Sequence, residues 1–163
     1  MPQLTRRHLT LGFLGAAAGC GAQMDGKAEG KTMAKQADPK TIPDYDKWRL
    51  SNEEWKKRLS PEAYAVLRRE ATERAGSSPL NDEKRKGVYA CAGCGLELFS
   101  SDAKFESGTG WPSFWDHLPG ALATKTDFKL IVPRTEYHCA RCGGHQGHVF
   151  KDGPEPTGLR YCN

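Results

Sequence analysis

Six cysteines carry most of the chemical information in this chain of 163 residues. Four of them form two C-x-x-C pairs, Cys91-Ala-Gly-Cys94 and Cys139-Ala-Arg-Cys142, and a glycine follows each pair. Two such turns supply four thiolates, which can surround one zinc ion tetrahedrally. Because four sulfur ligands leave no open coordination position, we predict a structural zinc site that ties together two hairpins far apart in the sequence.

Disulfide bonds are the alternative for these four cysteines, because an exported protein can form them. A bridge within each C-x-x-C pair would leave two exposed redox pairs in place of one closed site. Neither pair opens a helix in a β-α-β unit, so a thioredoxin-like function fits poorly. The spacing therefore favours zinc over disulfides.

The two remaining cysteines are Cys20 and Cys162, and Cys162 is the second-last residue. Cys20 belongs to an N-terminal segment with the pattern of an export signal. Cys162 is then a lone free thiol, which indicates either intermolecular pairing or a reactive group. A catalytic thiol needs a nearby positive charge or donor that favours the thiolate. Arg160 can supply that charge, so we predict that Cys162 is a nucleophile.

The stretch "GGHQGHVFKDG" places two histidines in a glycine-rich setting. His145 or His148 could bring an imidazole to a site, and Asp152 follows closely enough to orient that ring. Taken alone, such a histidine pair is more often part of the packing or of the surface.

The stretch "FESGTGWPSFW" combines a glycine turn with aromatic residues. Gly108 and Gly110 favour a turn, and Trp111 is held extended because a proline follows it. Phe114 and Trp115 add aromatic surface. Taken alone, such a cluster is most often part of a core.

Helices are expected ahead of the cysteine pairs, and strands around them. Ser51 with Glu54 has the pattern of a capping box, and Ser60 with Pro61 that of a second helix start, with Gly76 as its end. Short β-prone runs broken by glycine and proline follow Gly87. We predict a mainly β fold of antiparallel sheet with two short N-terminal helices.

Residues 1–20 have the pattern of a secretory signal, with a charged start, a short apolar run and small residues. The pair Arg6-Arg7 resembles a twin-arginine export signal. Two processing routes fit: cleavage after the Ala16-x-Ala18 motif, or a bacterial lipobox ending in "AAGC", which would put a lipid on Cys20. Both routes predict an exported protein of the periplasm or cell envelope.

Residues 21–46 are small, charged and proline-containing without an apolar period, and we predict a flexible linker before a folded domain at 47–163. Charged residues make up 27% of the chain and the net charge is +4, which is too mild to indicate nucleic-acid binding. No apolar stretch is long enough to span a membrane, so we expect membrane contact only through a lipid on Cys20. We also expect a monomer.

Three long stretches together resemble one family, peptide-methionine (R)-S-oxide reductase, the type B methionine sulfoxide reductase. They are "GVYACAGCGLELFSSDAKFESGTGWPSFW", "RTEYHCARCGGHQGHVF" and "DGPEPTGLRYC". The resemblance runs from about Trp48 to Cys162. It implies a β-tent of two antiparallel sheets and a structural zinc on Cys91, Cys94, Cys139 and Cys142.

The resemblance also assigns the nucleophile to Cys162 and a pocket to Trp111, His145, His148, Phe150, Asp152 and Arg160. An indole can pack against the methyl group of methionine sulfoxide, and a histidine can bond the oxygen and deliver a proton to it, with His148 preferred over His145. Cys162 would attack the sulfoxide sulfur and become a sulfenic acid. The family implies the R epimer and protein-bound methionine as substrate.

Two departures from the family pattern stand out. Many relatives carry a resolving cysteine between the two glycines of "SG-x-GWPSF", where this chain has Thr109. We therefore expect an external thiol, such as a thioredoxin-like protein, to regenerate Cys162.

The second departure follows the nucleophile. The family usually reads R-Y-C-x-N and continues into another strand, whereas here Asn163 follows Cys162 and ends the sequence. A terminal carboxylate beside Cys162 would disfavour the thiolate, and a missing strand would leave an open edge. The alternative hypothesis is therefore a zinc-stabilised binding module in which Cys162 is inactive.

Overall fold

The computed structural model describes residues 4–7, 38, 41–128 and 133–163. Most of the predicted export signal and linker, including Cys20, therefore lies outside the described residues. Within the predicted signal, Leu4–Arg7 forms strand β1, which pairs antiparallel with β2 (Val88–Cys91). None of the helices in the described ranges is long and apolar enough to cross a membrane.

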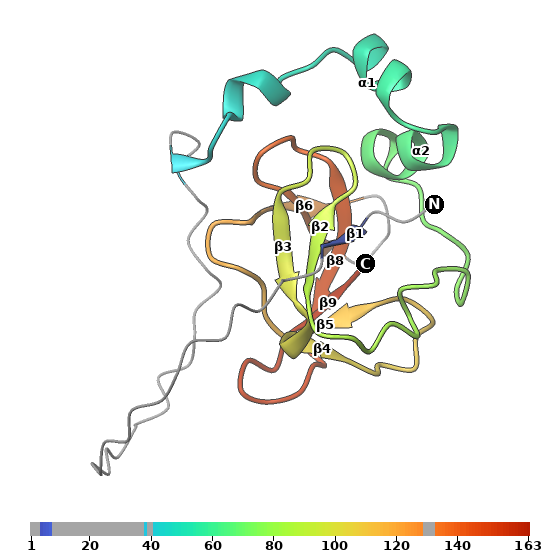
Figure 1. Cartoon of the computed structure of the whole chain (residues 1–163). Helices are drawn as coiled ribbons and strands as arrows, with labels where there is room; N and C mark the ends of the chain where they lie inside the picture. The colour runs from blue at the N-terminus through green and yellow to red at the C-terminus, as the bar shows by residue number, and fades with distance from the viewer. Residues whose placement is uncertain (1–3, 8–37, 39–40, 129–132) are drawn as a thin grey trace, which may run out of the picture.

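Two short helices precede β2 and the strands that follow it, as predicted, after a 3-10 turn at Tyr45–Trp48 (Figure 1). Helix α1 spans Asn52–Arg58, and its capping box is confirmed because Ser51 and Glu54 each bond the other's backbone N–H. Helix α2 spans Pro61–Arg69, with the Ser60 side chain as its N-terminal cap.

The predicted end of the second helix at Gly76 is wrong. Helix α2 ends where Glu70 adopts a left-handed conformation, with φ 55°. The Glu70 carboxylate lies 2.6 Å from Lys125 Nζ, and this tertiary contact holds the residue at the helix end. The following residues, including Ala71, therefore lie in an irregular segment rather than on the helix face.

All strand pairs are antiparallel and form two sheets, so the predicted fold class is confirmed. The smaller sheet has the order β1-β2-β3, with β3 at Glu97–Ser100. A 3-10 turn at Ser101–Ala103 leads into the larger sheet, which has the order β4-β5-β9-β8-β7-β6 (Figure 1). Its strands are β4 (Lys104–Phe105), β5 (Ser113–Phe114), β6 (Leu122–Asp127), β7 (Arg134–Cys139), β8 (His145–Phe150) and β9 (Arg160–Cys162).

Aromatic side chains join the two sheets. Phe99 of β3 stacks on Phe114 of β5, with ring centroids 4.2 Å apart, and Tyr89 of β2 meets the same ring edge-on. Tyr137 and Tyr161, from β7 and β9, complete the cluster around Phe99. Phe114, which the sequence placed in an aromatic cluster of the core, is fully buried here.

The strand that carries Cys162 lies inside the larger sheet, not at its edge. Strand β9 pairs with β5 on one side and β8 on the other. The backbones approach so closely that a Cβ on Gly147 would lie 1.9 Å from the Cys162 carbonyl oxygen. The expectation of an open edge beside the thiol is therefore wrong, because β5 occupies that position.

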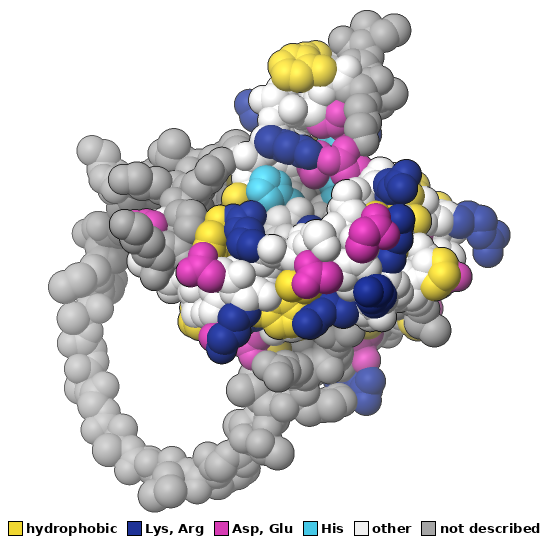
Figure 2. Space-filling model, turned by 90° about the horizontal axis from the view of Figure 1, so that it is seen from above, with side chains coloured by type: hydrophobic (Ala, Val, Ile, Leu, Met, Phe, Trp, Pro, Cys, Tyr) yellow, Lys and Arg dark blue, Asp and Glu magenta, His cyan; other side chains and the backbone are white. Residues whose placement is uncertain are grey.

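The outer surface carries charges of both signs. On the face in Figure 2, lysine, arginine and acidic side chains are interspersed. This pattern agrees with the modest net charge of the whole chain, +4.

The aromatic cluster should dominate the stability of the fold. Replacing Phe99 with alanine removes a fully buried ring, and we expect the free energy of unfolding to fall by about 3–5 kcal/mol. Phe128→Ala is the matched control, because Phe128 is 74% exposed. Urea denaturation of both variants checks this; equal stability of the two would contradict the assignment of the core.

Candidate functional site

Four cysteine sulfur atoms gather at one point where the two sheets meet. Cys91 ends β2 and Cys94 lies in the turn after it, while Cys139 ends β7 and Cys142 lies in the turn before β8. All four side chains are buried, and their sulfur atoms lie within 4.8 Å of one another. The sequence prediction that two distant hairpins share one cysteine cluster is confirmed.

The geometry of this cluster fits a metal ion and not disulfide bonds. The sulfur atoms of Cys91 and Cys142 are 3.6 Å apart, and those of Cys94 and Cys139 are 3.5 Å apart. A disulfide requires about 2.05 Å, whereas four ligands at about 2.3 Å from a tetrahedral zinc stand about 3.8 Å apart. The four thiols are free, so the donor set and its spacing suit a metal.

The helices cover the cysteine turns. Leu67 of α2 reaches the space beside Gly93, which precedes Cys94, and beside Gly144, which lies two residues after Cys142. Arg68 Nη1 donates a hydrogen bond to the Cys142 carbonyl oxygen at 2.9 Å. The amide of Gln146 on β8 donates to the Cys91 sulfur at 3.5 Å. The two short helices thus have a clear structural task, which is to close the cluster against solvent.

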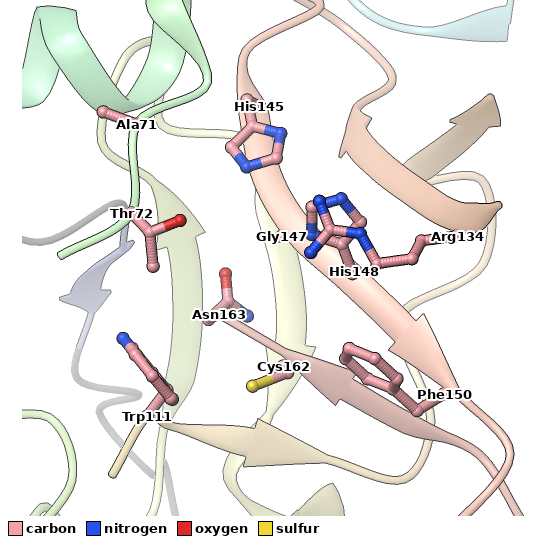
Figure 3. A pocket seen from close by; sticks show the side chains of 10 residues that line it. All are labelled: Ala71, Thr72, Trp111, Arg134, His145, Gly147, His148, Phe150, Cys162 and Asn163. Atoms are coloured by element: carbon pink, nitrogen blue, oxygen red, sulfur yellow. The ribbon is translucent and has the colours of Figure 1, made fainter. Parts of the chain in front are cut away.

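A second site is a cavity of about 150 Å³ on the larger sheet (Figure 3). It brings together four of the residues predicted for a pocket with the predicted nucleophile. Its lining consists of Ala71, Thr72, Trp111, Arg134, His145, Gly147, His148, Phe150, Cys162 and Asn163. Asp152 and Arg160 are not part of this lining.

Cys162 points its half-buried sulfur toward this cavity (Figure 3). The hydroxyl of Thr109 lies 3.9 Å from the sulfur. That hydroxyl is bonded in turn to Ser107 at 2.8 Å. Trp111 is held beside the sulfur because its indole N–H donates to the Glu73 carbonyl oxygen at 3.0 Å.

His148 is oriented by a carboxylate that the sequence analysis did not identify. Its Nε2 lies 2.8 Å from Asp127 Oδ2, and Arg134 donates to the same oxygen at 2.7 Å. Burial lowers the pKa of His148 below its ordinary value of 6.5; the charge of Arg134 adds to this, and the hydrogen bond with Asp127 opposes it. The ring is therefore predominantly neutral at pH 7.

His145 lies beside a different buried carboxylate. Its Nδ1 is 2.9 Å from Glu136 Oε1, which is ion-pair distance, although the alignment falls short of a hydrogen bond. The two imidazole rings meet edge to face, with centroids 5.6 Å apart. Both predicted histidines therefore reach the cavity, each with its own acidic neighbour.

Asp152 does not orient a histidine, contrary to the expectation from the sequence. Its two oxygens accept hydrogen bonds from Arg160 Nε and Nη2, both at 2.9 Å. This bond raises the pKa of Arg160, to which Cys162 also contributes, and lowers the pKa of Asp152. Arg160 in turn stacks over Phe150, with its guanidinium carbon 4.3 Å from the ring centre. Asp152 thus fixes Arg160, and Arg160 backs the cavity wall at Phe150.

Asn163 is 92% buried beside Cys162, as its exposed fraction is 8%. Its backbone N–H donates to the Pro112 carbonyl oxygen at 3.0 Å. Its side-chain amide lines the cavity (Figure 3). The main-chain bond therefore continues the pairing of β9 with the segment before β5.

Asp127, Arg134 and Glu136 are the site residues that sequence reasoning missed. Asp127 and Arg134 are directly opposite each other at the loop end of the β6–β7 hairpin. An acid and a base facing each other across a predicted hairpin is a signal that could have found this pair. Side chains of strand β7 point alternately to the two faces of the sheet, and only the fold shows that the side chain of Glu136 is buried.

Comparisons with known proteins show what this chain is similar to. Residues 59–163 match the SelR domain. The peptide methionine sulfoxide reductase MsrB of Methanosarcina barkeri is 59% identical over 113 residues, which are 69% of this chain and 80% of that protein.

Similar matches come from bacteria. The protein of the same name from Leptospira interrogans is 53% identical over 113 residues, covering 69% of this chain and 86% of its own length. That from Bradyrhizobium diazoefficiens is 52% identical over 126 residues, or 77% of this chain and 91% of its own length.

The contact between Asp127 and His148 can be tested by titration. Asp127→Asn removes the carboxylate whose hydrogen bond raises the pKa of His148 against the effects of burial and of Arg134. We therefore expect the pKa of His148 to fall further below 6.5. NMR titration of the imidazole in both proteins measures this.

The same variant predicts a change in stability with pH. Because the folded pKa of His148 is depressed, the unfolded chain binds the proton first, so stability is lost as pH falls from about 6.5 through the folded pKa. The loss should be larger in Asp127→Asn and unchanged in Asp102→Asn, an exposed aspartate outside the site. A His148 pKa that rises in Asp127→Asn would show that the contact does not act as described.

Proposed function

This chain belongs to the MsrB family of peptide methionine sulfoxide reductases, and we propose that it reduces methionine sulfoxide with Cys162 as its nucleophile. It is an oxidoreductase that converts methionine sulfoxide to methionine. One observation carries the proposed role of Cys162: its sulfur lines the cavity that Trp111, His145 and His148 also line (Figure 3).

The proposed chemistry transfers one oxygen atom. The Cys162 thiolate attacks the sulfoxide sulfur, and a histidine of the cavity gives a proton to the sulfoxide oxygen. The oxygen then passes from the substrate sulfur to the Cys162 sulfur while the substrate's sulfur–oxygen bond and the new sulfur–sulfur bond both break, so that methionine leaves and Cys162 carries the oxygen as a sulfenic acid. In net terms, a thiol and a sulfoxide become a sulfenic acid and a thioether.

The cavity lining supports this substrate class. The Trp111 indole offers an apolar face for the methyl group, and its fixed N–H holds that face in place. The imidazoles of His145 and His148 lie where a polar oxygen would need partners. We propose the R epimer of protein-bound methionine sulfoxide because the family resemblance implies it; the apolar face and the fixed polar groups support the choice of a single epimer.

Arg160 is proposed to favour the Cys162 thiolate. Its guanidinium is fixed by two bonds to Asp152, and Cys162 contributes to the raised pKa of Arg160. The positive charge therefore cannot swing away from the strand that bears the nucleophile. In this proposal Asp152 acts through Arg160 and does not touch the substrate.

The sulfenic acid is proposed to be reduced by an external thiol, such as a thioredoxin-like protein. Thr109 is the neighbour of the Cys162 sulfur at the position where many relatives carry a resolving cysteine. Its hydroxyl can bond the sulfenic acid but cannot form a disulfide with it. The other described cysteines form the four-sulfur cluster.

The alternative of an inactive binding module is not supported. The match to the SelR domain spans the whole cavity-forming region, residues 59–163. Cys162 lies on an internal strand with the histidines and Trp111 around it.

Mass spectrometry after a single turnover tests the proposed function. With excess methionine sulfoxide and no reductant, we expect one added oxygen on Cys162 and one methionine per enzyme. Cys162→Ser should form no methionine, whereas Cys20→Ser, the matched control, should behave as the unaltered chain. Methionine formation by Cys162→Ser would overturn the proposed nucleophile, and an intramolecular disulfide to Cys162 would overturn the proposed external reductant.

The four-cysteine cluster is proposed to hold zinc, since four thiolates at this spacing are the ligands of structural zinc sites. Bound zinc would offset half of the charge of the four thiolates and tie the two turns together. It would take no part in the reaction, because the four sulfurs fill its coordination sphere.

Export is proposed from residues 1–20. The support is the Arg6-Arg7 pair, the short apolar run after it and the small residues before Cys20. Four reduced thiols are easiest to load with zinc before export. Removal of this segment would also remove β1 and leave β2 at the edge of its sheet.

The zinc proposal and the export proposal can be tested on one sample. The full chain is expressed in a bacterium with a twin-arginine route and purified from the envelope. We expect one zinc per chain by elemental mass spectrometry, no disulfides, and either cleavage after Ala18 or a lipid on Cys20. Cys94→Ser should lose the zinc and unfold at a lower temperature. Protein confined to the cytoplasm would contradict export, and envelope protein with disulfides and no zinc would contradict zinc loading.

A further inference from the structure

A chain of charged side chains leads away from His145 on the side opposite the Cys162 cavity. Glu136 Oε1 lies 2.9 Å from His145 Nδ1, and Glu136 Oε2 lies 3.2 Å from Lys125 Nζ. Lys125 also pairs with Glu70 at 2.6 Å. These contacts join strands β6, β7 and β8 to the end of helix α2.

His145 separates two cavities. It lines the cavity that contains Cys162, and it also lines a second, more polar cavity of about 300 Å³. The second cavity is lined by Asn52, Leu67, Arg68, Glu70, Lys125, Glu136, His138, Gly143 and His145. One ring therefore has one side on the substrate cavity and one side on a cavity of charged groups.

The two histidines each have a carboxylate beside a different ring nitrogen. Asp127 meets Nε2 of His148, whereas Glu136 meets Nδ1 of His145. A ring nitrogen beside a carboxylate carries its hydrogen, because a bare lone pair there would face the negative charge. His148 therefore has Nδ1 left for the substrate cavity, and His145 has Nε2 left.

Glu136 is unusual because it is a carboxylate in the interior. Its side chain is only 3% exposed, and a buried charge requires a partner. Lys125, half exposed, supplies that partner from the polar cavity. The carboxylate is thus held between a cation on one oxygen and an imidazole on the other, which leaves it little freedom to turn away.

We propose that Glu136, held by Lys125, is a positioning residue that fixes His145 with its hydrogen on Nδ1 and its Nε2 available to the substrate. The role in the reaction rests on the proposed function of the Cys162 cavity. When a protein substrate closes that cavity, the Glu136 side of the ring remains next to the polar cavity. In the doubly protonated ring Nε2 carries the second hydrogen, and this is the proton that His145 gives to the sulfoxide oxygen.

The tautomer of His145 is a direct test that needs no activity. Long-range hydrogen–nitrogen NMR of the full chain distinguishes a protonated Nδ1 from a protonated Nε2. We expect Nδ1–H for neutral His145 in the unaltered protein. In Glu136→Gln, whose amide can donate as well as accept, this preference should weaken or reverse. Glu97→Gln, the same change on an exposed residue of β3, should leave it as it was.

Kinetics on a sulfoxide-containing peptide tests the consequence. We expect kcat of Glu136→Gln to fall by about tenfold or more, since a mis-set proton donor loses part of a factor of about 10²–10⁴, while KM changes by less than about twofold. Glu97→Gln should retain both constants. Lys125→Met should reproduce the kcat loss with Glu136 still present.

Several results would overturn the proposal. A neutral His145 with Nε2–H in the unaltered protein would do so even if Glu136→Gln failed to fold. An unchanged tautomer and kcat in Glu136→Gln would do so as well. If Cys162→Ser were active, the proposed nucleophile would fail, but the tautomer result would stand, so the two failures are distinguishable.

Discussion

Four sulfur atoms at the junction of two turns are the constraint on which the rest of the structure depends. One turn belongs to the smaller sheet and the other links two strands of the larger sheet, and both helices seat their apolar side chains over them. The turn that carries Cys142 leads directly into β8, which bears both site histidines. Fixing the sulfurs therefore fixes where β8 begins. Strand β8 then sets β9 through the close approach at Gly147, so Cys162 is placed by the same constraint.

Buried charge is the second organising feature. Asp127 with Arg134 and Glu136 with Lys125 each place a carboxylate beside a histidine and a cation on the same carboxylate. Burying such pairs gains little stability, because desolvation offsets most of the attraction. The benefit we propose for them is geometric, since each carboxylate lies beside one nitrogen of its histidine and leaves the other for the cavity. A reaction that moves one proton and one oxygen atom needs ring nitrogens in fixed positions.

The surroundings of Cys162 separate reaction from regeneration. The sulfur has a hydroxyl at 3.9 Å, where a second thiol would have offered an internal disulfide. Under the proposed function, the cavity holds the groups for oxygen transfer and the reducing thiol comes from another molecule. The half-buried position of Cys162 on an internal strand suits this division, because one face of the sulfur opens to the cavity while its backbone stays paired.

The sequence by itself determined the cysteine cluster, the two helix starts, the antiparallel β class and Cys162 as the residue to place at a site. These depend on spacing and local chemistry: C-x-x-C turns, capping side chains, and short apolar runs between glycines. Tertiary structure alone decided that Asp127 and Glu136, not Asp152, lie beside the histidines, and that α2 ends at Glu70. Each of these depends on which residues of different strands face each other and on what is buried there. Strand register and burial are set by packing of the whole chain. From sequence alone, Asp152, which is close to the histidines along the chain, was therefore preferred over Asp127 and Glu136, which are close to them in space.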